Sequence, residues 1–260
     1  MLPDDPSSIV WSDMRKIYLV PNFVTTANMF CGFYSMVASI HGDFIPAAWA
    51  ILAAAIFDML DGRIARLARA TSQFGVEYDS LSDLISFGLA PSILFYRWSL
   101  EPFGRLGWAA AFLFVACGAL RLARFNVTAA VLPKGYFQGL PIPMGAGIAA
   151  TFYIFSQAMG WEAVSEEYVV LVLTFALAGL MISTVPFPSF KELNWRSRTS
   201  FAYLIAAVLV MILVAIKPEV VIFVLLSSYV ILSLFWWVVR LARGEKFVIS
   251  EKPGGSQQSH

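Results

Sequence analysis

The stretch FDMLDGRIARLARATSQFGVEYDSLSDLISFGLAPS, residues 57–92, decides how this chain is interpreted. It joins the end of one apolar segment to the start of the next and carries four aspartates, Asp58, Asp61, Asp79 and Asp83. Residues three or four apart on a helix share a face, so Asp58 pairs with Asp61, and Asp79 pairs with Asp83. Two antiparallel helices joined by a short turn would bring both pairs together at one end of a helix bundle.

Four carboxylates close to a membrane repel one another and are costly to bury, so a cation must offset them. Oxygen ligands without nitrogen or sulfur suit a hard divalent ion such as Mg²⁺, Mn²⁺ or Ca²⁺. Two such ions a few ångströms apart can bridge a diphosphate. Gly62, directly after Asp61, costs a helix about 1 kcal/mol relative to alanine. That cost is justified where a ligand comes close, although tight helix packing is an alternative explanation.

The surrounding composition is that of a membrane protein. Of the 260 residues, 59% are hydrophobic and only 13% are charged, about half the charged share of a soluble domain. This excludes an ordinary soluble enzyme, a disordered chain and a disulfide scaffold, and it indicates an all-α polytopic membrane protein. Cys31 and Cys117 lie in apolar stretches and suggest no disulfide or zinc site. Neither His41 nor His260 is placed for catalysis, so acid–base chemistry falls to the carboxylates.

Crossing a bilayer as a helix takes about 20 predominantly apolar residues. Eight segments meet this requirement, and we expect about eight transmembrane helices: Leu19–Ile40, Ile45–Leu67, Leu81–Trp98, Leu106–Leu122, Pro141–Met159, Tyr168–Val185, Phe201–Ile216 and Val220–Val239. The expected organisation is an interfacial helix over 1–18, a six-helix core over 19–186, two additional helices over 187–243 and a flexible tail over 244–260.

The positive charges predict the orientation of these helices. If the N-terminus and every second connection are assigned to one side, that side receives fifteen of the 18 lysines and arginines, and the other receives only Arg97, Arg105 and Lys217. The positive-inside rule then places both termini in the cytoplasm of a multi-pass cell (inner) membrane protein. The four aspartates lie on the same, cytoplasmic side.

As a whole, the stretch has the pattern D58-x-x-D61-G62-x-x-A65-R66-x8-G75-x-x-x-D79-x-x-x-D83. This resembles the signature of the CDP-alcohol phosphotransferases, membrane enzymes of phospholipid synthesis, in all eight fixed positions. The resemblance implies that Asp58, Asp61 and Asp79 are metal ligands. It implies that Asp83 also belongs to the metal site and acts as the general base. Magnesium or manganese would be the cofactor, in a site for two ions.

The resemblance extends to the binding of the nucleotide. The opening PNFVTTANMFCG, residues 21–32, is similar to the Pro-Asn-x-x-Thr opening of the same family. It implies that Asn22 and Thr25 line the nucleotide or metal site. The other residues implied to bind CDP are Asp61, Gly62, Ala65, Arg66 and Gly75.

Three further blocks concern the acceptor alcohol. SDLISFGLAPS (82–92), GALRLARFN (118–126) and GLPIPMGAG (139–147) resemble the branch of the family that uses serine. The implied reaction transfers the phosphatidyl group of CDP-diacylglycerol to L-serine in a homodimer within the lipid bilayer, with no nucleic-acid partner. Candidates for binding serine or the lipid phosphate are Arg121, Arg124, Lys134 and Gln138. The arginines could instead be ordinary cytoplasmic anchors.

Other functions remain open at this point. A sister enzyme would use glycerol 3-phosphate or an inositol phosphate as acceptor, and the same basic residues could bind the extra phosphate. An ion-coupled transporter would also carry aspartates in its spans. However, these four aspartates cluster at one membrane face, and no charges continue toward the other. A purely structural membrane scaffold gives no reason for four carboxylates at this spacing.

Overall fold

The computed structural model describes residues 6–67, 72–128, 136–161, 163–188 and 200–243. The fold is almost entirely helical, as the composition predicts. The α-helices are α1 (Pro6–His41), α2 (Phe44–Leu67), α3 (Gln73–Asp83), α4 (Ala90–Phe95), α5 (Arg105–Thr128), α6 (Ile142–Met159), α7 (Ala163–Ile182), α8 (Ser200–Ile216) and α9 (Pro218–Ala242).

Each of the predicted apolar segments falls on a helical stretch. Among the described residues, four stretches are long and apolar enough to cross a membrane: Asn22–His41, Phe44–Ile64, Arg105–Val127 and Pro218–Ala242. The shorter apolar stretches Glu167–Ile182 and Ala207–Ile216 accompany them. The protein is therefore a multi-pass membrane protein, while the crossing of all eight segments stays a prediction.

The third predicted segment is less regular than a single α-helix. After α3 the chain continues through the π-helical turns η1 (Leu84–Leu89), then α4, then the π-helical turns η2 (Tyr96–Leu100) and the short 3₁₀ turn η3 (Glu101–Phe103). A π-helical turn holds more residues than an α-helical one, so it rotates the side chains that follow. Pro91 lacks the N–H that a regular helix would require four residues after Phe87. The first π-helical segment begins directly after Asp83.

One feature departs from the all-α expectation. Two strands, β1 (Tyr136–Gln138) and β2 (Pro186–Pro188), pair antiparallel with Phe137 opposite Phe187. Gly139, directly after β1, has φ of +79°, a conformation that glycine adopts without strain. Three-residue strands bounded by glycine and proline have the composition of turns, so the sequence pattern did not predict this ribbon.

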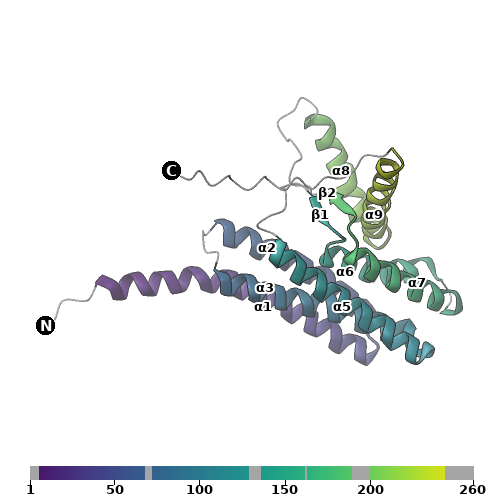
Figure 1. Cartoon of the computed structure of the whole chain (residues 1–260), viewed down its shortest axis with the longest axis horizontal. Helices are drawn as coiled ribbons and strands as arrows, with labels where there is room; N and C mark the ends of the chain where they lie inside the picture. The colour runs from purple at the N-terminus through teal and green to yellow at the C-terminus, as the bar shows by residue number, and fades with distance from the viewer. Residues whose placement is uncertain (1–5, 68–71, 129–135, 162, 189–199, 244–260) are drawn as a thin grey trace, which may run out of the picture.

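The helices that carry the aspartates pack on α1. It runs without a break from Pro6, so the segment predicted as a separate interfacial helix continues directly into the first span (Figure 1). Along its second half it packs against α2, α3 and η1. Elsewhere α5 packs on α7, and α6 packs on both α2 and α9. Figure 1 shows α8 and α9 on the side of the molecule away from α1 and α3.

Candidate active site

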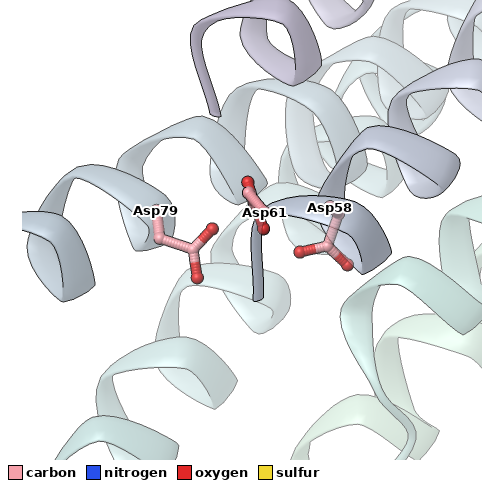
Figure 2. Close-up of side chains that lie close together, drawn as sticks. All are labelled: Asp58, Asp61 and Asp79. Atoms are coloured by element: carbon pink, nitrogen blue, oxygen red, sulfur yellow. The ribbon is translucent and has the colours of Figure 1, made fainter. Parts of the chain in front are cut away.

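Three carboxylates converge where α2 meets α3. Asp58 and Asp61 lie on the last turns of α2, and Asp79 lies on α3. One carboxylate oxygen of each lies within 4.8 Å of those of the other two. Figure 2 shows the three side chains directed toward a common space from the two helices. Asp61 is only 3% exposed, and the other two are half-buried.

This group has the properties of a cation site. Among the described residues, no lysine or arginine forms an ion pair with any of the three aspartates. The Oδ1 atom of Asp79 is buried and has no hydrogen-bond partner in the described part of the chain. Burial, together with the charge of Asp61, raises the pKa of Asp79 to about 6. An oxygen-only set of close, uncompensated carboxylates fits a hard divalent ion.

Helix α1 supports this group from the opposite side. The Thr25 hydroxyl donates a hydrogen bond to Asp61 Oδ2 at 3.0 Å. At the start of α3, the Ser72 hydroxyl accepts the Gly75 N–H at 3.0 Å and caps the helix. A Cβ atom on Gly75 would stand 3.8 Å from Asn22 Oδ1. Thus Asn22, Thr25, Asp61 and Gly75, all predicted to bind CDP, are neighbours in space.

Asp83, the fourth aspartate of the pattern, lies at the end of α3. The sequence pattern placed all four in one metal group, but the group within 4.8 Å contains only Asp58, Asp61 and Asp79. Asp83 is 9% exposed and accepts a hydrogen bond from Asn28 Nδ2 at 3.4 Å. Its charge still interacts with those of the other three. It therefore faces the same region from the end of α3, and its roles as metal ligand and general base stay predictions.

Arg121, on α5, is the cation on the Asp83 side of the site. It is 7% exposed, and its helix α5 packs against η1, which begins directly after Asp83. Its guanidinium lies over the Phe125 ring, 5.8 Å from the ring centroid. Its Nε atom is buried and lacks a hydrogen-bond partner among the described residues. A buried guanidinium with an unused donor is suited to binding an anion.

Arg124, one turn further along α5, makes different contacts. Its guanidinium donates hydrogen bonds to the main-chain carbonyls of Ile182, Gln138, Met181 and Ser183, at 2.8, 3.0, 3.1 and 3.3 Å. These carbonyls belong to the C-terminal end of α7 and to β1. A cation there satisfies carbonyls that the helix leaves unpaired. The Arg124 side chain and the Gln138 carbonyl therefore join α5, α7 and β1, and the role of both residues in binding serine or the lipid phosphate stays a prediction.

The remaining predicted site residues are placed as follows. Gly62 is half-buried on α2, directly after Asp61. Ala65 and Arg66 belong to α2, but their side chains lie outside the described part of the structure. Lys134 lies outside the described residues altogether.

Three polar residues that the sequence pattern did not single out hold α1 against α3 and η1. Ser82 donates to the Thr25 carbonyl, and Ser86 donates to the Asn28 carbonyl, each at 3.0 Å. Asn28 in turn donates to Asp83. A usable signal was present, since Asn28 is an amide inside an apolar span, and polar groups in such spans are costly and usually functional. Ser82 and Ser86 are four apart and so share a helix face.

Comparison with known proteins agrees with this geometry. The profile of the family described as CDP-alcohol phosphatidyltransferase matches residues 18–186, which include all four aspartates and both arginines. The chain belongs to this family. Residues outside the match include α8 and α9.

Individual relatives of the chain carry a narrower name. A CDP-diacylglycerol–serine O-phosphatidyltransferase of Helicobacter pylori is 34% identical over 88% of this chain and 95% of its own length. A protein of the same name from Bacillus subtilis is 32% identical over 66% of this chain and 92% of its own. An archaetidylserine synthase of Methanothermobacter thermautotrophicus is 36% identical over 65% of this chain and 69% of its own. All three names refer to serine.

Proposed function

We propose that this protein is a phosphatidylserine synthase, which transfers the phosphatidyl group of CDP-diacylglycerol to the hydroxyl of L-serine and releases CMP. The observation that carries the proposal is the convergence of Asp58, Asp61 and Asp79 from two helices, with Asp83 beside them. It lies within a segment that matches a family of CDP-alcohol enzymes. The names of the relatives support serine as the acceptor.

The proposed reaction is a single displacement at phosphorus. The serine hydroxyl oxygen attacks the phosphorus that bears the diacylglycerol, and a new P–O bond forms. The bond from that phosphorus to the CMP oxygen breaks, and CMP leaves with the bonding electrons. Asp83 accepts the hydroxyl proton and later releases it to solvent. Positioning and stabilisation of charge supply most of the acceleration in such transfers.

Asp58, Asp61 and Asp79 would hold Mg²⁺ or Mn²⁺, and such ions stabilise the negative charge that develops on a diphosphate. Other residues of the chain orient these ligands and shape the pocket for CDP. Thr25 orients Asp61 through its hydrogen bond. Asn22 and Gly75, with Gly62, Ala65 and Arg66 on α2, would form the wall against the CDP group. The small size of the two glycines lets the nucleotide approach the helices closely.

Serine is favoured over a phosphorylated acceptor by the contacts of the basic residues. An acceptor such as glycerol 3-phosphate requires several converging cations. Arg124 is engaged by four main-chain carbonyls, and Arg121 is the buried cation beside Asp83 among the described residues. One guanidinium matches the single carboxylate of serine.

We further propose that the site faces the cytoplasm, with both termini on that side, and that the protein works as a homodimer. The distribution of lysine and arginine supports the orientation. The acyl chains of the donor would then remain in the bilayer while the nucleotide occupies the cytoplasmic end of α1, α2 and α3.

An acceptor panel tests the proposal. Protein purified in detergent is incubated with CDP-diacylglycerol, Mg²⁺ or Mn²⁺, and one acceptor at a time: L-serine, glycerol 3-phosphate, inositol or inositol phosphate. Release of CMP and formation of a new lipid are measured together. We expect both with serine. Product formation with another acceptor and none with serine would contradict the proposal while leaving the family unchanged.

A further inference from the structure

Two buried polar atoms near Asp83 lack a hydrogen-bond partner in the part of the chain that the structure describes, and they differ in kind. Asn28 Oδ1 is a hydrogen-bond acceptor on a side chain that is 0% exposed. Arg121 Nε is a donor on a side chain that is 7% exposed. Neither atom has a hydrogen-bond partner within the described ranges of the chain. Leaving a buried polar atom unpaired costs about 1–3 kcal/mol, so each atom requires an explanation.

The orientation of the Asn28 amide follows from its neighbour. In the ionised form that a general base requires, Asp83 can only accept hydrogen bonds, and the amide nitrogen faces it, at 3.4 Å from Oδ1. The amide oxygen then points away from Asp83. The backbone of Asn28 is held independently, because its carbonyl accepts the Ser86 hydroxyl at 3.0 Å. The side-chain oxygen is thus fixed in position and available to a donor.

Asp83 is the common neighbour of these two side chains. Asn28 reaches it through a hydrogen bond, from α1. Arg121 approaches from α5, which packs against η1, the segment directly after Asp83. The junction of α1, α3, η1 and α5 therefore carries a proton acceptor, a neutral hydrogen-bond acceptor and a cationic donor.

We infer that Asn28 and Arg121 select serine by its two charged groups, the ammonium at Asn28 Oδ1 and the carboxylate at Arg121. This inference rests on the proposed function and assigns the acceptor contacts within it. A free amino acid carries one donor group and one anionic group on the same carbon, and the two orphaned atoms complement them. The hydroxyl of the same molecule then lies at Asp83. Alcohols of the family that lack an ammonium group would leave Asn28 Oδ1 unpaired, and a site with an unpaired polar atom discriminates against them.

The test uses two serine analogues, each lacking one charged group. 3-Hydroxypropanoate is serine without its ammonium, and ethanolamine is serine without its carboxylate. We compare kcat/KM for serine with kcat/KM for each analogue, using the full-length protein in detergent with CDP-diacylglycerol and Mg²⁺ or Mn²⁺. Where an analogue is not converted, its inhibition constant against serine replaces its kcat/KM.

Two substitutions separate the contacts. Asn28→Leu is expected to lower the preference for serine over 3-hydroxypropanoate by about tenfold or more, because a hydrogen bond to a charged group is lost. It should leave the preference over ethanolamine unchanged. Arg121→Gln should lower the preference for serine over ethanolamine and leave the preference over 3-hydroxypropanoate unchanged. Ser39→Ala is the matched control, since Ser39 is buried on the same helix and its hydroxyl donates to the Ser35 carbonyl of α1.

The ratios of kcat/KM for serine to kcat/KM for each analogue distinguish recognition of serine by Asn28 from mere positioning of Asp83. If Asn28 only orients Asp83, Asn28→Leu lowers kcat for every acceptor, and both ratios stay at their wild-type values; that result would overturn the inference. If Asn28→Leu releases no CMP at all, equilibrium binding of serine and 3-hydroxypropanoate to the purified variant supplies the ratio. The proposed function is tested separately: if it is wrong, the wild-type protein releases no CMP with serine.

Discussion

Gly32 on α1 packs directly against Ser86 on η1. A methyl group on Gly32 would stand 2.6 Å from Ser86 Cα, closer than real side chains approach. One turn earlier on α1, the Asn28 carbonyl accepts the Ser86 hydroxyl, and its amide bonds Asp83. The closeness of α1 and η1 at Gly32 therefore controls the distance between Asn28 and Asp83.

Gly32→Ala should separate the two helices and weaken both stability and turnover. Overpacking of this kind costs about 1–3 kcal/mol. We expect a lower melting temperature in detergent and a lower kcat. Gly179→Ala is the matched control, because a methyl group at Gly179 on α7 would meet nothing within 4 Å. Equal melting temperatures and equal kcat values for the two variants would show that the contact of Gly32 with Ser86 has no role in the site.

Removal of a carboxylate from the group of three should abolish both activity and metal binding. We expect Asp61→Asn to release no measurable CMP, and chelation with EDTA to stop the wild-type enzyme until Mg²⁺ or Mn²⁺ is restored. The wild-type melting temperature should rise on addition of the ion, because a ligand that binds only the folded state stabilises it. That rise should vanish in Asp61→Asn. Asp43→Asn, at an exposed aspartate between α1 and α2, is the control. An unchanged metal response in Asp61→Asn would exclude this group as the metal site.

Asp83→Asn tests the assignment of the general base. Loss of a general base lowers turnover by about 10²–10⁴-fold. Because Asp83 lies outside the group of three carboxylates, we expect the variant to bind CDP-diacylglycerol, and to respond to Mg²⁺ or Mn²⁺ in melting temperature, as the wild type does. Near-normal synthesis of phosphatidylserine by this variant would disprove the assignment.

The sequence pattern predicted the helices and the aspartate group because both depend on short-range spacing. Asp58 and Asp61 share a face of α2 whatever the rest of the chain does, and α3, which packs with α2 on α1, carries Asp79 beside them. The hydrogen bond that Asp83 accepts comes from Asn28 on α1, 55 residues away in the chain. Such a contact cannot be read from the spacing within residues 57–92.

Sequence spacing also does not show the long-range contacts of the two arginines of α5. Arg121 and Arg124 are three residues apart and have equal charge, so the spacing treats them alike. In the fold they face different partners. Arg121 is beside Asp83, and Arg124 binds carbonyls of α7 and β1. The β1–β2 ribbon that completes the Arg124 contacts joins chain segments about 50 residues apart, which no local pattern specifies.

This difference predicts opposite effects for the two arginines. Arg124→Gln removes the cation from four carbonyls at the junction of α5, α7 and β1. Hydrogen bonds from a charged donor contribute about 1.5–3 kcal/mol each, so we expect a markedly lower melting temperature and a KM for serine close to that of the wild type. Arg121→Gln should raise that KM and change the melting temperature less. Melting curves and steady-state kinetics of the two purified variants measure both effects. If Arg124→Gln instead raised the KM for serine without loss of stability, Arg124 would belong to the acceptor site, and its carbonyl contacts would have to be released in the working enzyme.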